Sequence, residues 1–331
     1  MRGKRRNSPE LPDASAGTPE ERRERARQDF TFFRRAYFPH YCLVGGDSRL
    51  HEWLDTELPR MADAPEGVRL AIAAPRGEAK STFVSLFFVL WAVLTGRKHY
   101  ILIIADALEQ AASLLGAVKD ELEFNEALKR DFPGAGKGHV WNVGTVVTPG
   151  NVKIQALGAG KRMRGLRHGP HRPDLIVLDD LENDGNVDKP EQRDKLQSWL
   201  QKTVLNLGAA DGSMDVVYVG TLLHYDSVLA RTLRKPLWKA RTFRSILRWP
   251  DRMDLWDEWE SLLSSRGEAE ARRFYRQHRV KMEAGAEVSW PASRPLYRLM
   301  CLRAEDREAF DSEQQNDPLS ANEAPFNGCI T

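Results

Sequence analysis

Two short segments carry the residue types needed to bind and hydrolyse a nucleoside triphosphate. The first, residues 68–82, is an apolar strand followed by a loop of small residues that ends in Lys-Ser-Thr and opens a helix. Backbone N–H groups and a helix N-terminus in this order can cradle phosphate, and Lys80 can reach the terminal phosphates. The second, residues 175–182, is an apolar strand that ends in carboxylates, which can hold Mg²⁺ and orient a water molecule.

The phosphate loop departs from the usual pattern G-x-x-x-x-G-K-[ST]. Both outer glycines are alanines, Ala74 and Ala79, and Gly77 lies inside the loop. Because alanine disfavours positive φ, we expect negative φ at both alanines. Taken alone, the loop also fits a strand-to-helix turn with an incidental lysine, and the acidic pair fits the start of a solvated loop. Together, in this order and on these elements, they favour a nucleotide-hydrolysing site.

Each residue type suggests a role in that chemistry. Ser81 is the expected Mg²⁺ ligand through its hydroxyl, ahead of Thr82, and Asp179 is the second ligand because Mg²⁺ takes few carboxylates and keeps several waters. We expect Asp180 to polarise the attacking water, with Glu182 as the alternative because its longer side chain reaches further. The residues expected to contact ATP are Pro75, Arg76, Gly77, Glu78, Ala79, Lys80, Ser81 and Thr82.

Three further positions could respond to the γ-phosphate. Arg76 could approach it within the same subunit, or instead pair with Glu78 or stay solvated. A basic group at 160–172 contains Arg164, a candidate arginine finger for a neighbouring subunit or a contact for DNA phosphates. Gly220-Thr221 follows another apolar strand. The Thr221 hydroxyl could sense the γ-phosphate and transmit the loss of that phosphate to residues 222–229.

These residues need a scaffold of alternating strands and helices. The pattern predicts strands at 68–74, 100–105, 151–156, 175–178 and 215–220, and helices at 49–58, 80–95, 108–128, 191–205 and 254–281. Such alternation predicts an α/β fold of three layers with a mostly parallel central sheet flanked by helices, in which ligands bind at the carboxyl ends of strands. We expect a charged and disordered arm at 1–28, the core at 29–250, and a small helical subdomain and linker at 251–331, in which residues 311–331 form the loop or linker.

The bulk composition fits a protein of this kind. The chain has 331 residues, of which 41% are hydrophobic and 29% charged, and its net charge of +2 leaves any DNA contact to local patches. The three cysteines are far apart and predict neither a disulfide framework nor a cysteine-rich zinc site. The longest apolar run, 83–94, is shorter than the ~20 residues of a membrane span and predicts the buried helix after the phosphate loop.

Four segments in combination, 74–82, 163–165, 174–184 and 219–224, resemble the large terminase subunit of tailed bacteriophages. The resemblance implies a P-loop ATPase of the ASCE type, whose sheet has an added strand. It also implies Mg²⁺ with ATP as substrate, and ATP-driven translocation of double-stranded viral DNA into a procapsid. The implied partners are DNA, a portal protein, a small terminase subunit and further copies in a ring. The implied location is the host cytoplasm, transiently at the portal vertex, with no membrane contact.

By the same resemblance, Arg76 matches an extra basic residue of the family's loop, Arg164 its Arg-Gly, and Gly220-Thr221 its coupling motif. His51 falls where the family contacts adenine, commonly with glutamine. Asp180 stands where the family usually has glutamate, which leaves Glu182 open as the catalytic carboxylate.

The region after residue 250 departs from the family in a second way. Members of the family normally carry a C-terminal nuclease, whose metal ions are held by acidic residues at strand ends. Here the acids lie in a helical stretch instead, so we expect an ATPase motor domain without a nuclease domain. These acids are Asp251, Asp254, Asp257, Glu258 and Glu260. Two other functions stay open: a helicase-like or other DNA-remodelling ATPase, and a nucleotide-binding scaffold that does not hydrolyse, which the two lost glycines favour.

Overall fold

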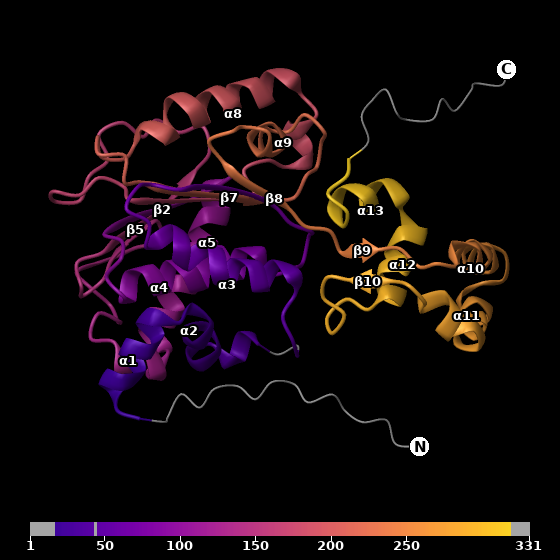
Figure 1. The fold of residues 1–331 in the computed structure, drawn as a ribbon. Coiled ribbons are helices and arrows are strands. Elements are labelled where there is room, and N and C mark those ends of the chain that lie inside the picture. The colour runs from indigo at the N-terminus through magenta and orange to yellow at the C-terminus, as the bar shows by residue number, and fades with distance from the viewer. Residues whose placement is uncertain (1–16, 43–44, 319–331) are drawn as a thin grey trace.

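A mixed sheet of eight strands forms the centre of the molecule (Figure 1). The computed structural model describes residues 17–42 and 45–318, so the expectations for residues 1–16 and 319–331 lie outside the described residues. The strand order is β3-β4-β5-β2-β6-β7-β1-β8, and every pair from β5 across to β8 is parallel, whereas β3 and β4 pair antiparallel. The strands are β1 (Arg69–Ala73), β2 (Tyr100–Ala105), β3 (Val140–Trp141), β4 (Thr145–Val147), β5 (Lys153–Gly158), β6 (Leu175–Asp179), β7 (Asp215–Gly220) and β8 (Lys239–Thr242).

Helices cover both faces of the sheet. Successive side chains of a buried strand point to opposite faces, and they belong to two separate hydrophobic clusters, one on each face. Ile101 and Ile103 of β2 belong to one cluster, whereas Leu102 and Ile104 belong to the other. The first cluster is closed by α1 (Pro19–Gln28), α2 (Phe30–Tyr37), α3 (Arg49–Ala62), η2 (Thr82–Phe88), α4 (Val89–Leu94), α5 (Leu108–Phe124) and α6 (Glu126–Asp131). The second is closed by α8 (Pro190–Lys202), the short turn η3 (Val204–Asn206) and α9 (Val228–Leu233). The predicted three-layer α/β fold is therefore confirmed.

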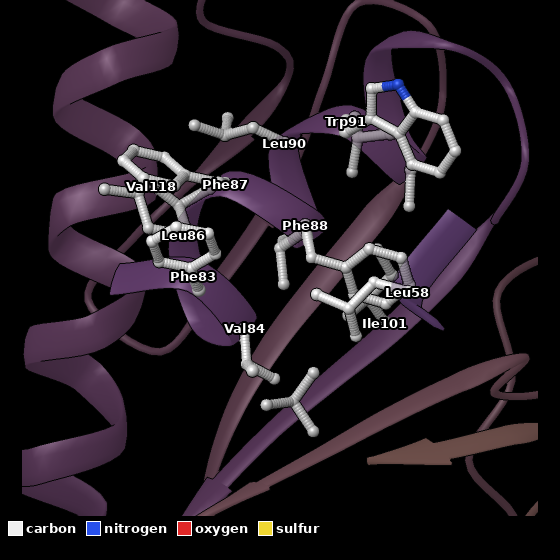
Figure 2. Close-up of a cluster of buried hydrophobic side chains, with 14 of the residues drawn as sticks. Leu58, Phe83, Val84, Leu86, Phe87, Phe88, Leu90, Trp91, Ile101 and Val118 are labelled. Atoms are coloured by element: carbon white, nitrogen blue, oxygen red, sulfur yellow. The ribbon is translucent and has the colours of Figure 1, made fainter. Parts of the chain in front are cut away.

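The helix after the phosphate loop lies in the centre of the first cluster. Residues 83–93 are all buried, and Figure 2 shows Phe83, Phe87, Phe88 and Trp91 packed among aliphatic side chains of neighbouring elements. The apolar run is thus a buried helix, as predicted, but its first turns (η2) are wider π-helical turns before α4 continues as an ordinary helix. π-helical turns inside helices are often found at functional sites.

The charged helix α1 is held against this layer rather than projecting from it. Trp91 donates its indole N–H to the carbonyl of Ala26 at 2.8 Å. Arg22 forms a buried ion pair with Asp131, with 2.5 Å between Nη2 and Oδ1, and Tyr37 donates to the same carboxylate. Residues 19–28 therefore belong to the packed body of the molecule.

The C-terminal region has a small hydrophobic core of its own, centred on Trp256, Trp259 and Met300. We call residues 246–316 the C-terminal subdomain; Figure 1 shows it beside the edge of the main sheet that carries β8. Its elements are β9 (Ile246–Arg248), α10 (Met253–Arg266), α11 (Glu268–Glu283), β10 (Glu287–Val288), α12 (Leu296–Glu305) and α13 (Arg307–Glu313). No helix in residues 17–42 and 45–318 is both long and apolar enough to cross a bilayer.

The arm predicted as disordered at 1–28 is a packed helix over residues 19–28, and the structure corrects three further predicted segments. The helix predicted at 254–281 is two helices, because Gly267 adopts φ +85° and ends α10. The helix predicted at 108–128 also breaks, at Asn125, whose side chain caps the next helix. Residues 311–316, expected in a loop or linker, continue α13 and then bury Gln314, Gln315 and Asn316.

Candidate functional site

The two predicted segments meet at one edge of the sheet, as expected from the parallel order. Strand β7 lies between β1, which leads into the phosphate loop, and β6, which ends in Asp179. The carboxyl ends of these three neighbouring strands therefore bring together the loop, the acidic pair and Gly220-Thr221. This is also the arrangement with an added strand that the sequence resemblance implied.

The backbone of the phosphate loop is more strained than predicted. Gly77 has φ +79°, and Ala79 has φ +56°, so the expectation of negative φ at Ala79 is wrong. Left-handed φ costs an alanine of the order of 1 kcal/mol or more. The buried side chain of His51 holds the loop in this shape. Its Nε2 contacts the carbonyl of Glu78 at 2.9 Å, and its ring stacks on Phe83.

Lys80 connects the loop to the other two strand ends. Its side chain is only 8% exposed, and Nζ donates to Thr221 Oγ1 at 3.1 Å and lies 3.3 Å from Asp180 Oδ2. The Thr221 hydroxyl in turn donates to the carbonyl of Ala74 at 3.2 Å. The ammonium group is thus positioned at the mouth of the loop by two residues that lie at least 100 positions further along the chain.

Asp179 lies behind the loop and is fully buried. Its Oδ1 accepts a hydrogen bond from Ser81 at 3.0 Å, and its Oδ2 accepts one from Ser85 at 2.5 Å. Burial and the neighbouring charge of Asp180 raise the pKa of Asp179, and the two serine hydroxyls and Lys80 oppose that shift. A serine hydroxyl and a carboxylate are hard oxygen donors of the kind that Mg²⁺ takes, so these residues fit the ion. Ser81, rather than Thr82, makes this contact.

The neighbouring carboxylates have different surroundings. Asp180 has φ +47° and a one-third exposed side chain beside Lys80. Asp tolerates left-handed φ better than most residues, and such strain concentrates at functional sites. Glu182 instead accepts backbone N–H bonds from Val228 at 2.8 Å and Leu229 at 3.1 Å, at the start of α9. Burial raises the pKa of Glu182. Of the two, Asp180 is the one beside the phosphate loop's lysine.

The other loop residues predicted to contact ATP are engaged with the protein. Arg76 pairs with Glu313 of α13 at 2.9 Å, rather than with Glu78, and its backbone N–H donates to the carbonyl of Glu313. Glu78 is buried and accepts a hydrogen bond from Ser289 at 3.3 Å. Pro75 is buried as well. The ATP contacts assigned to these residues stay predictions.

His51 is also fully engaged. It is 2% exposed, its Nδ1 accepts the backbone N–H of Ser48 at 3.2 Å in the cap of α3, and its Nε2 supports the loop through Glu78. The adenine contact implied by the resemblance stays a prediction, and the contacts observed make His51 a support of the loop.

Arg164 follows β5 in the loop that leaves the same edge of the sheet. Its side chain is exposed, and Gly165 after it has φ +78°. No ion pair between Arg164 and a carboxylate occurs in the described part of the chain. The structure thus leaves both predicted roles of Arg164, arginine finger or DNA contact, sterically open.

Two solved structures resemble this fold at a distance. One is the large terminase ATPase domain of Thermus phage P74-26, with 15% sequence identity, 79% of this chain and 92% of that chain covered, and a TM-score of 0.39. The other is a mutant of that domain, with 13% identity, 77% and 90% coverage, and a TM-score of 0.36. No protein-family model and no curated protein matches the sequence. At such TM-scores the likeness carries no argument about function, which must rest on the residues of the site.

Sequence reasoning missed several residues of the site. Ser85 could have been found, because it follows Ser81 by four positions and so lies on the same face of a helix. Arg294, Gln314 and Asn316 carry no local signal, since they reach the site only through the docking of the C-terminal subdomain. Leu222 N–H, for example, donates to Asn316 Oδ1 at 2.9 Å.

Proposed function

We propose that this chain is a Mg²⁺-dependent ATPase. The observation that carries the proposal is the meeting of two pairs at one edge of the sheet, Lys80 with Asp180 and Ser81 with Asp179. A cation, a hydroxyl–carboxylate pair and a second, more exposed carboxylate are the parts that phosphoryl transfer to water requires. Intact Lys80, Ser81 and both aspartates argue against a scaffold that binds without hydrolysis.

Each residue has a definite task in this proposal. Lys80 neutralises charge on the terminal phosphates, and Thr221 holds it in place. Ser81 and Asp179 hold Mg²⁺, which supplies further charge neutralisation when bound. Asp180 orients a water and accepts its proton as the water oxygen bonds to the γ-phosphorus, while the bond to the β-phosphate oxygen breaks and leaves ADP and phosphate.

We further propose that hydrolysis drives translocation of double-stranded viral DNA into a procapsid. The support is the combined resemblance of four sequence segments to large terminase subunits. The exposed Arg164 suits an arginine finger offered to a neighbouring copy in a ring, whereas Arg76 is paired with Glu313. In this proposal the chain acts in the host cytoplasm with a portal protein and a small terminase subunit.

ATP hydrolysis by purified protein tests the catalytic site. Lys80→Ala should reduce turnover to background, because it removes the charge at the mouth of the loop. Lys202→Ala, at the exposed end of α8, is the matched control and should hydrolyse ATP like the unaltered protein. Equal turnover in Lys80→Ala and Lys202→Ala would remove this site from consideration.

Assays on DNA test the motor function. The protein, assembled with portal and procapsid, should protect duplex DNA from nuclease digestion in an ATP-dependent way and should not separate its strands. Strand separation by the purified protein would favour a helicase-like enzyme instead. Metal-dependent nicking of plasmid DNA would contradict the expectation that this chain lacks nuclease activity.

A further inference from the structure

An arginine of the C-terminal subdomain lies directly against the phosphate loop. A Cβ atom built on Gly77 would come within 1.9 Å of Nη2 of Arg294, so the guanidinium group occupies the space that a side chain at this position would need. Gly77 also has φ +79°, a conformation that other residues adopt at a cost. The glycine inside the loop therefore permits both the turn and the close approach of Arg294.

The charge of Arg294 is not matched by an acid. The side chain is partly buried, and its Nη1 donates to a neutral amide oxygen, Oε1 of Gln314, at 2.5 Å. Across residues 17–42 and 45–318, no carboxylate lies within ion-pair distance of it. Burial lowers the pKa of Arg294, and the charge of Glu78 opposes that shift from a greater distance. A partly buried guanidinium without an anion, next to a loop built for phosphate, is a site for an anion.

Residues 313–316 fix the position of Arg294 relative to the edge of the sheet that carries Lys80 and Asp180. The end of α13 is bonded to the loop, because the backbone N–H of Arg76 donates to the carbonyl of Glu313 at 2.9 Å. The segment after α13 is bonded to the chain just beyond β7, where the backbone N–H of Leu222 donates to Asn316 Oδ1. Gln314, which binds Arg294, lies between these two anchors in sequence. The position of the guanidinium is thus set from both sides of the site.

We propose that Arg294 binds the phosphates of ATP held in the loop, so that the C-terminal subdomain contributes a positive charge to the nucleotide site. This inference rests on the proposed function, since it needs ATP in the loop. Arginine suits the task because its planar fork donates two hydrogen bonds to phosphate oxygens. The subdomain is then bound more tightly to the core when ATP is present, because both share the ligand.

Calorimetric titration with a non-hydrolysable ATP analogue and Mg²⁺ tests the inference. Arg294→Ala should weaken binding about tenfold or more, the loss expected for a charge-assisted hydrogen bond, and Arg294→Lys should recover part of it. Arg298→Ala is the matched control, because this arginine lies one helical turn further on, on α12, and is exposed. It should bind within about twofold of the unaltered protein.

A second variant separates binding from a merely structural contact with Gln314. Gln314→Glu places a carboxylate 2.5 Å from the guanidinium, which keeps the contact but neutralises the charge. It should weaken binding of the analogue about as much as Arg294→Ala does, whereas a structural role predicts unchanged binding. Thermal melting of each variant confirms that it is folded.

The outcomes also separate this inference from the proposed function. If Lys80→Ala abolishes binding and Arg294→Ala and Gln314→Glu bind like the unaltered protein, the role of Arg294 is refuted and the ATP site stands. If the unaltered protein binds no ATP analogue, both fail.

Discussion

The two neighbouring acids, Asp180 and Glu182, can be separated by matched substitutions. We predict that Asp180→Asn lowers the turnover number for ATP by about 10²–10⁴, the range for removal of a general base, and barely changes stability. Glu182→Gln should keep turnover within a fewfold of the unaltered protein. The reasoning is geometric, because only the Asp180 carboxylate faces Lys80, at 3.3 Å.

The expected effects on stability follow from the same contacts. The Asp180 side chain is 33% exposed, so its ion pair with Lys80 is screened and contributes less than about 1 kcal/mol to the free energy of unfolding. Asn also tolerates the left-handed φ of +47° at this position, so the backbone is not further strained. Any large loss of turnover in Asp180→Asn therefore reflects chemistry rather than unfolding.

The Glu182 carboxylate instead stabilises the fold, because it caps the start of α9. Truncation in Glu182→Ala leaves two backbone N–H groups of α9 without their acceptor, each worth about 0.5–1.5 kcal/mol net. Because burial raises the pKa of Glu182, the cost of its buried charge offsets part of this gain. We therefore expect Glu182→Ala to lower the free energy of unfolding by about 1–2 kcal/mol.

Steady-state ATP hydrolysis at saturating ATP and urea unfolding give the two readings. The assay is run on the isolated chain and on the chain with portal and procapsid, as the proposed motor function requires, with Lys80→Ala as the inactive reference. If Asp180→Asn hydrolyses ATP normally and Glu182→Gln does not, the assignment of the catalytic carboxylate is reversed. Equal losses in both variants would mean that the two acids act as one unit.

Three further predictions concern the scaffold. Trp91→Ala should lower the free energy of unfolding in urea by about 3–5 kcal/mol, because it empties buried volume and removes the hydrogen bond that holds α1; a change below about 1 kcal/mol would contradict this packing. Burial alone would raise the pKa of Asp131, but hydrogen bonds from Arg22 and its neighbours outweigh it and hold the pKa below its usual range. Asp131 thus contributes stability above about pH 4 that is lost as the pH falls, and Asp131→Asn should flatten acid unfolding followed by circular dichroism. Gly267→Ala should destabilise by about 1–3 kcal/mol because of its φ of +85°, whereas Gly116→Ala, inside α5 with open space around it, should stabilise by about 0.5–1 kcal/mol. Thermal melts that shift in the same direction for both glycine variants would refute this argument.

The sequence predicted the sheet, and the meeting of the candidate residues at one edge of it, because those features depend on local patterns. Buried parallel strands read as continuous apolar runs, and each of the five predicted strands overlaps one in the structure. Alternating strands and helices imply a parallel sheet, and the carboxyl ends of parallel strands lie at the same edge. Lys80 and Asp179 are therefore expected at that edge. Short or exposed strands were missed, such as β3 with two residues and β8 with four exposed ones, since neither carries a periodic signal.

The conformations of single residues were harder to predict. Ala79 adopts positive φ although alanine disfavours it, because the surrounding contacts of the loop compensate for the strain. Gly267 divides a continuous helical pattern, and one glycine inside such a pattern is not decisive by itself. At Ala79, tertiary contacts outweigh an intrinsic preference of about 1 kcal/mol, whereas Gly267 follows the preference of glycine for positive φ at a helix end.

The amino-acid sequence by itself determined which residues could do the chemistry and at which edge of the sheet they would lie. It could do so because the patterns that predict strands, loops and helices involve residues close together in the chain. Tertiary structure alone decided what stands around them. It assigned Glu182 to the start of a helix and Asp180 to Lys80, paired Arg76 with Glu313, and set Arg294 against Gly77 from more than 200 positions away. The contacts of Arg76 and Arg294 depend on how two separately packed cores dock, and no local pattern in the chain encodes that.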